Sequence, residues 1–161
     1  MAAASDHISQ AKKNLATLET LNACTPDSWD WEITMCFYTA VHIVNAHIVN
    51  TANAHYRTHM NVANALNPHN VASISKIDLD AYLAYKKLEG LSRRARYLCH
   101  QNPNNQDTRS FFTDERHFSR AIKHLDKVMK YFDDRYSINF PTINITCPRL
   151  SGQTFNYFSI Q

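Results

Sequence analysis

Glycine is scarce in this 161-residue chain, which contains only Gly90 and Gly152, and proline occurs five times. Sandwiches and barrels need turn residues about every ten positions, so this scarcity argues against them and favours a few long helices. No two of the four cysteines are close enough to form a CxxC metal knuckle. No apolar run approaches the roughly 20 residues that a membrane-spanning helix needs. We therefore predict a helical protein without a membrane segment.

Neither the net charge nor the first residues of the chain point to a particular partner or cellular destination. The formal net charge is only +3, which is too small to indicate nucleic-acid binding by itself. The segment from Met1 to Ser5 lacks the basic and apolar regions of a leader peptide. The composition, 44% hydrophobic and 19% charged, is typical of a folded domain. We expect a cytoplasmic protein with reduced cysteines.

Apolar residues recur at helical spacing in five segments. They predict helices over residues 5–23, 26–50, 58–66, 78–100 and 113–133. Ser5 and Thr58 are suitable N-caps, and Pro26 is tolerated at a first helical position. The segment 26–50 is the longest and is expected to be central. Gly90 lies inside a predicted helix at a cost of about 1 kcal/mol, which indicates that another group packs closely there.

The end of the chain has a different pattern, in which apolar and polar side chains alternate. The apolar positions are Ile143, Ile145, Cys147, Phe155 and Tyr157. A period of two is typical of strands, but an isolated two-stranded hairpin is barely stable in water. We therefore predict an all-α, up-and-down four- or five-helix bundle over residues 1–136. Residues 137–161 should form an extended arm or a β-hairpin that packs on the bundle or on a partner chain.

The segment from Ser92 to His100 concentrates residues suited to phosphate chemistry. On one continuous helix Arg93, Arg96 and His100 lie within about 60° of one another, with Ser92 on the flank. Arginine offers several donors to a phosphodiester, and histidine carries protons near neutral pH. The segment therefore suits RNA cleavage without a metal, with His100 as acid or base and an arginine stabilising the phosphate. The alternative is a solvated helix face whose cations are favoured by the helix dipole.

The chain has nine histidines, and the remaining eight need the same comparison. His42, His55 and His59 could converge with His100 on a metal such as zinc, as the basis of a metal-dependent hydrolase. No cysteine or carboxylate completes a recognisable ligand spacing, so we predict neither a metal nor a cofactor. Hydrogen-bonded core histidines are the alternative. The histidines expected at the surface are His7, His47, His69, His117 and His124.

Aromatic residues cluster at the start of the 26–50 segment. They are Trp29, Trp31, Phe37 and Tyr38. Aromatic rings can stack on nucleic-acid bases. These residues interleave with the apolar face of the predicted helix, however, so packing in the core or in an interface is the interpretation we favour.

Three stretches, taken together and in order, resemble bacterial HEPN-like proteins. Asp30-Trp31 followed by Phe37-Tyr38-Thr39-Ala40-Val41-His42 is similar to a helix that reads D-W, then Y-Y-x-A-x-H. His55-Tyr56-Arg57-Thr58-His59 resembles the H-P-x-S-H loop of these proteins. Tyr85, Leu88, Leu91-Ser92-Arg93 and Ala95-Arg96-Tyr97 resemble the helix Y-x-x-L-x-x-L-S-R-x-A-R-Y that follows. The resemblance covers about residues 28–100.

The resemblance implies a helical bundle that pairs as a homodimer. HEPN ribonucleases carry an arginine and, a few residues later, a histidine at the end of a helix, and two copies together form the cleavage site. Here five residues separate Arg94 from His100, six separate Arg93 from it, and three separate Arg96 from it. The resemblance therefore implies His100 with Arg93, Arg94 or Arg96 as catalytic residues. The implied substrate-binding residues are His42, His55, His59, Tyr85, Ser92 and Tyr97.

The sequence departs from the ribonuclease pattern in two places. Ala95 and Tyr97 follow Arg94 and Arg96, where the ribonucleases commonly have asparagine or another polar residue. The stretch Met60-Asn61-Val62 also lacks the arginine that usually follows the histidine loop. The prediction is a HEPN-like RNase or RNA-processing toxin acting at a dimer interface. The alternative is a non-catalytic HEPN module that binds a nucleotide or a partner protein, such as an antitoxin or another product of the same operon.

Overall fold

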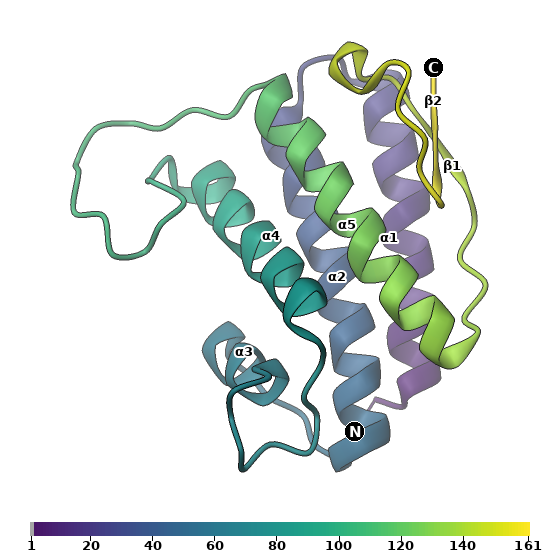
Figure 1. Cartoon of the computed structure of the whole chain (residues 1–161). Helices are drawn as coiled ribbons and strands as arrows, with labels where there is room; N and C mark the ends of the chain where they lie inside the picture. The colour runs from purple at the N-terminus through teal and green to yellow at the C-terminus, as the bar shows by residue number, and fades with distance from the viewer. Residues whose placement is uncertain (1) are drawn as a thin grey trace.

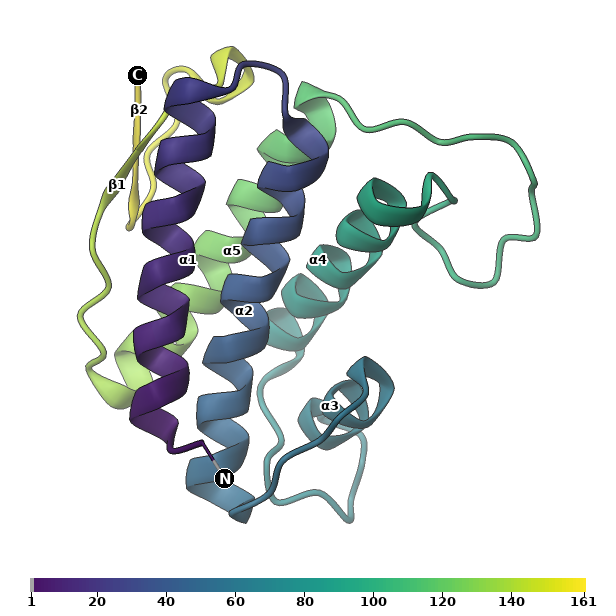
Figure 2. The same cartoon turned by 180° about the vertical axis from the view of Figure 1, so that it is seen from behind.

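The computed structural model describes residues 2–161 and contains five α-helices followed by a short arm. The elements are α1 (Ala4–Cys24), α2 (Trp29–Ala52), α3 (His59–Leu66), α4 (Leu79–Tyr97), α5 (Glu115–Tyr136), β1 (Ile143–Ile145), a 3₁₀ turn η1 (Pro148–Leu150) and β2 (Phe158–Ile160). The four long helices run alternately up and down, and α3 packs beside α2 and α4 (Figures 1 and 2). The predicted all-α bundle with a C-terminal arm is confirmed.

Helix α2 lies at the centre of the bundle, in contact with α1, α4 and α5. Its buried apolar side chains lie around most of the helix circumference, as Ile33, Val41, Ile43 and Ala46 illustrate. A helix that is apolar around most of its circumference has to be covered on several sides. This composition explains why the longest predicted helix takes the central position.

Helix α4 ends three residues earlier than predicted, at Tyr97. Leu98 adopts the left-handed conformation, with φ of 52°, and its N–H donates to the carbonyl of Arg94. The carbonyl of Leu98 in turn accepts from the N–H of Phe111 at 2.7 Å, which fixes the return of the 98–114 loop. His100 therefore lies beyond the helix, and the predicted strip that placed it beside Arg93 and Arg96 is wrong.

Gly90 is required because the loop after α4 folds back onto this helix. A Cβ atom at Gly90 would lie 2.9 Å from the backbone carbonyl oxygen of Gln101, closer than a methyl group tolerates. The close neighbour predicted from a glycine inside a helix is confirmed. The same contact brings Gln101 and the residues around it against the outer side of α4.

The C-terminal arm lies against α1 and α5 (Figures 1 and 2). Strands β1 and β2 are parallel, with Ile143 opposite Phe158 and Ile145 opposite Ile160. The tail is therefore an extended arm that turns back through η1. The hairpin alternative does not occur, because the strands of a hairpin are antiparallel.

None of the helices in the described part of the chain is both long and apolar enough to traverse a bilayer. The four cysteines are free thiols, two of them buried: Cys36 on α2 and Cys147 in the arm.

Candidate functional site

The three arginines of α4 extend in different directions. Arg94 donates through Nε and Nη2 to the carbonyl of Phe112, at 2.9 and 2.5 Å, and its guanidinium lies over the ring of Phe111. Arg93 borders a shallow pocket on the outer side of α4. Arg96 turns toward α2. The structure thus separates the arginines that the sequence grouped as a single phosphate-binding set.

His100 shares a pocket with lysines, and not with the arginines of α4. Its Nδ1 accepts from the N–H of Asn102 at 3.0 Å, which leaves the neutral ring with its proton on Nε2. The ring packs edge-on against Phe111. His100 also lines a pocket of about 420 Å³ together with Lys86 and Lys87, and none of the three arginines lines that pocket. If His100 acts as an acid or base, the lysines and not the arginines are the cations that can stabilise the charge of a phosphate in its pocket.

Arg96 lies in an aromatic setting between α2 and α4. Its guanidinium carbon is 5.0 Å from the ring centre of Tyr97 and 5.8 Å from that of Tyr38. Its Nε donates to the carbonyl of Ser92, at the long distance of 3.3 Å. Among the ion pairs of residues 2–161, none includes Arg96. Cation–π contacts fix the position of the guanidinium without neutralising its charge.

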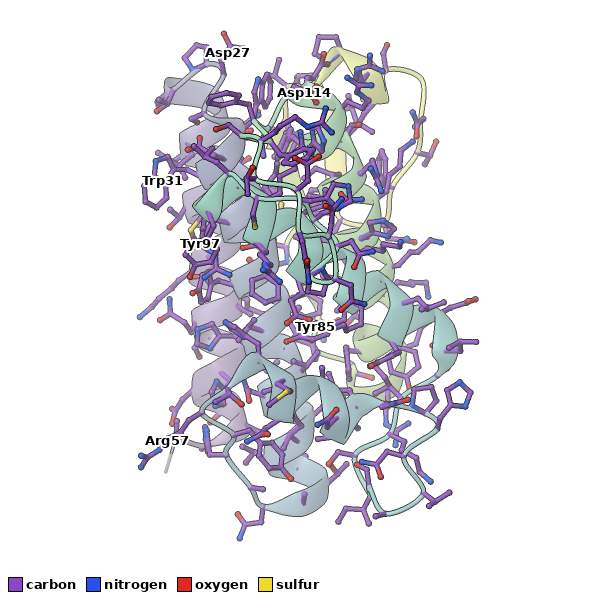
Figure 3. The ribbon with its side chains drawn as sticks, turned by 90° about the vertical axis from the view of Figure 1, so that its left-hand side faces the viewer. Asp27, Trp31, Arg57, Tyr85, Tyr97 and Asp114 are labelled. Carbon is purple, nitrogen blue, oxygen red and sulfur yellow. The ribbon has the colours of Figure 1, made fainter. Side chains whose placement is uncertain are left out.

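Two large aromatic side chains flank Arg96 in solvent. Trp31 of α2 is 63% exposed and Tyr97 of α4 is 66% exposed. Both project from the same edge of the bundle (Figure 3). A small pocket of about 140 Å³ lies between Trp31 and Arg96, lined by these two residues and by Asp30, Thr34 and Ala95. We call the surface formed by Trp31, Tyr38, Arg96 and Tyr97 the Arg96 face.

Tyr85 and Ser92 lie beneath this face, inside the core. Both are fully buried on α4, two turns apart. The prediction that Ser92 lies on the flank of an exposed strip is therefore wrong. Burial raises the pKa of Tyr85 far above its usual range. Within the described residues neither hydroxyl has a hydrogen-bond partner, which is uncommon for buried polar groups.

His59 reaches the same region from the first turn of α3. Its ring packs edge-on against Phe37 at 5.0 Å, and Phe37 also contacts Tyr85. Burial lowers the pKa of His59, and the positive charge of Arg96 acts in the same direction, while Glu89 acts against it. The structure therefore brings together five of the predicted residues: His59, Tyr85, Ser92, Arg96 and Tyr97.

His42 and His55 belong to a different cluster, in which they are joined by His7. Nδ1 of His7 lies 3.0 Å from Nδ1 of His42, and its Nε2 lies 3.3 Å from Nε2 of His55. Nε2 of His55 also lies 3.1 Å from the carbonyl oxygen of Ala2, so it must carry a proton. His7 then accepts at Nε2 and donates from Nδ1 to His42, so the rings of His7 and His42 are neutral.

His7 was expected at the surface, but it is only 8% exposed and lies at the centre of this cluster. Its position could have revealed it, because His7 precedes Ala11 by four residues and so lies on the buried stripe of α1. Burial lowers the pKa of His7, and the neighbouring His42 and His55 lower it further. The cluster ties the start of α1 to α2 and to the loop before α3.

The geometry of the histidine cluster is that of a chain rather than of a metal centre. The two ring nitrogens of His7 form hydrogen bonds with different partners, Nδ1 with His42 and Nε2 with His55. The three rings therefore do not converge on one point. Across residues 2–161 no group of three or more potential ligands is arranged to hold a metal ion.

Other histidines predicted to be exposed are also partly or fully enclosed. His47 is buried, with Nδ1 2.6 Å from the hydroxyl of Tyr136 and Nε2 3.0 Å from the carbonyl of Ser75. The prediction of a surface position is wrong for His47 as it is for His7. Burial lowers the pKa of His124 to about 4, with help from the cations around it. His69 is exposed as predicted.

No protein-family model, curated protein or solved structure matches this chain. The resemblance to HEPN proteins therefore stays a prediction that depends on the three stretches between residues 28 and 100. Helical bundles serve many unrelated functions, so function has to be argued from the side chains of the site.

Proposed function

We propose that this protein is a HEPN-like domain that binds a nucleotide or a single-stranded segment of RNA on the Arg96 face. The observation that supports this proposal is a guanidinium without a carboxylate partner, placed between tyrosine rings and flanked by two exposed aromatic side chains. Phosphate is the chemical group that such a guanidinium binds best, because its planar fork offers parallel donors.

The exposed rings of Trp31 and Tyr97 can bind the base of the same nucleotide. Stacking of a base on an aromatic side chain contributes about 1–3 kcal/mol and tolerates any base. Trp31 and Tyr97 border Arg96 from different helices, so a phosphate on Arg96 leaves its own base within reach of a ring. Asp30 lines the pocket that Trp31 and Arg96 share, and provides an acceptor for a base amino group or a ribose hydroxyl.

Replacement of Arg96 by alanine is expected to weaken binding of a short fluorescent oligouridylate by about tenfold, the loss of one charge-assisted phosphate contact. Trp31→Ala should weaken it to a similar degree through lost stacking. Fluorescence anisotropy of the labelled RNA measures both. Arg135→Ala is the matched control, since Arg135 also lies over a tyrosine ring but belongs to the far end of α5. Equal affinity of the parent and the Arg96→Ala protein would refute the proposal.

A homodimer, an antitoxin or other operon partner, and a cytoplasmic location stay predictions. Trp31 and Tyr97 of the Arg96 face are exposed large hydrophobic side chains, which a second copy would bury. Sedimentation velocity at several protein concentrations, with and without RNA, measures how many copies assemble. A dimer that excludes RNA would assign this face to self-association.

RNA cleavage without a metal is the second candidate function, and the position of His100 favours it. His100 lines one pocket with Lys86 and Lys87, and its Nε2 remains free for a substrate. In this scheme a ribose 2′-hydroxyl loses its proton to water while that oxygen bonds to phosphorus. The 5′-oxygen leaves with the proton of Nε2, water restores the proton on the ring, and the lysines stabilise the charge on the phosphate.

Labelled RNA incubated in EDTA with the parent protein, the His100→Ala variant and the Lys87→Ala variant tests this candidate. We expect cleavage by the parent, a loss of at least a hundredfold in rate for His100→Ala, and a smaller loss for Lys87→Ala. The candidate is removed if the parent leaves the RNA intact or if His100→Ala cleaves it equally fast.

A further inference from the structure

We infer that a second surface, formed by α4 and α5, binds the phosphodiester backbone of a nucleic acid. Its cations are Lys87 of α4 and Arg120, Lys123 and Lys127 of α5, and we call it the α4–α5 band. The three α5 residues lie within about 60° of one another on the side of the helix opposite the buried stripe that contains Leu125.

The cations of the band have no acidic partners. Among the ion pairs of the described residues, none includes any of the four. An exposed helix usually alternates acids and bases at a spacing of four residues. Between Arg116 and Lys127 the only acid is Asp126, and its buried carboxylate is bonded to the C-terminal arm. The like charges of Lys123 and Lys127 therefore destabilise the helix slightly unless an anion lies over them.

The lowered pKa of His124 reflects the density of positive charge around its ring. The groups that lower its pKa after burial are, in order, Arg120, Lys127, Lys87 and Lys123, so all four cations of the band surround this one ring. Its Nδ1 is shielded from solvent and has no hydrogen-bond partner within residues 2–161. At its lower end the band is bounded by acids, because Lys127 shares a pocket with Asp78 and Asp80.

The chemistry of the band favours a polyphosphate chain over an acidic protein. Protein interfaces are anchored by large apolar or aromatic side chains, and α5 has none among the exposed large hydrophobic residues of the described chain. From Arg120 to Lys127 the helix rises about 10 Å. One nucleic-acid strand presents a phosphate about every 3.4 Å along its axis, so this length matches about three phosphates. The band is independent of the Arg96 face, which lies on the α2 side of α4.

The test measures binding of a labelled 20-nucleotide RNA, single-stranded and as a duplex, over a series of salt concentrations. We expect the triple variant Arg120→Gln/Lys123→Gln/Lys127→Gln to bind at least tenfold more weakly at low salt. The slope of log K against log salt should fall by about 2 to 3, since each lost phosphate contact removes about 0.7 to 0.9. The control is Lys13→Gln/Lys76→Gln/Arg135→Gln, which loses the same charge elsewhere and should keep the slope of the parent.

Two further readouts separate this inference from the proposed function. RNA should raise the pKa of His124 in NMR titrations of both the parent protein and the Arg96→Ala variant. Arg96→Ala should lower affinity for a short oligonucleotide and keep the salt slope of the longer RNA within about 1. An unchanged slope in the triple variant overturns the inference. So does polyglutamate that displaces the RNA at equal charge concentration, which would identify an acidic protein as the partner.

Discussion

Replacement of Asp126 by alanine is expected to lower the free energy of unfolding by about 3–4 kcal/mol and to release the end of the C-terminal arm. The carboxylate of Asp126 is 7% exposed and accepts three hydrogen bonds from the arm. The donors are the backbone N–H of Asn156 at 2.9 Å, the side-chain amide of Asn156 at 2.7 Å and the backbone N–H of Tyr157 at 3.1 Å. A hydrogen bond to a charged group contributes about 1.5–3 kcal/mol, and these three share one acceptor group, so their contributions do not add fully.

Urea unfolding measures the stability, and hydrogen exchange of the amides of Asn156 and Tyr157 measures the release of the arm. Asp126→Asn is the matched variant, because its carbonyl oxygen still accepts from both backbone donors. It should lose less than half as much stability as Asp126→Ala. If the alanine variant unfolds within about 0.5 kcal/mol of the parent, the carboxylate does not hold the arm in place.

The existence and order of the helices could be predicted because their apolar periods are long and regular. The segment expected over residues 5–23 became α1 over Ala4–Cys24, and the segment expected over residues 113–133 became α5 over Glu115–Tyr136. The end of α4 could not be predicted in the same way. Left-handed caps are usually glycine or asparagine, and here leucine takes that position, so no local residue marks the stop.

The site shows the same division between local pattern and tertiary structure. The resemblance implied a site that includes Arg96 and Tyr97, and these two side chains are in contact at the end of α4. It could not show that Arg94 would be bound by the carbonyl of Phe112, because the position of that carbonyl depends on the course of the 98–114 loop. The period of two also indicated strands in the arm, but their parallel direction depends on η1 and on the carboxylates of α1 and α5 that bind the arm.

The unfolding free energy is also expected to fall by about 2–3 kcal/mol as the pH decreases from 7 to 5. Burial is the first cause that lowers the pKa of six histidines: His7, His42, His47, His59, His117 and His124. Below a pH of about 6.5 the unfolded chain binds more protons on these rings than the folded chain, so the folded state loses stability as the pH falls. Each group then contributes up to about 1.4 kcal/mol per pH unit, a value reduced here because the rings are only partly shielded from solvent.

Glu32 acts in the opposite direction and has to be separated from the histidines. Burial raises the pKa of Glu32 to about 7, so the folded chain takes up this proton well before the unfolded chain does. Glu32 therefore adds stability as the pH falls below 7, and Glu32→Gln should make the decline steeper. His7→Gln should make it shallower, and His69→Gln, which removes an exposed imidazole, should leave the slope as in the parent. Urea titrations at pH 7, 6 and 5 measure these slopes, and a parent whose stability stays constant over that range would contradict the lowered pKa values of His7 and His42.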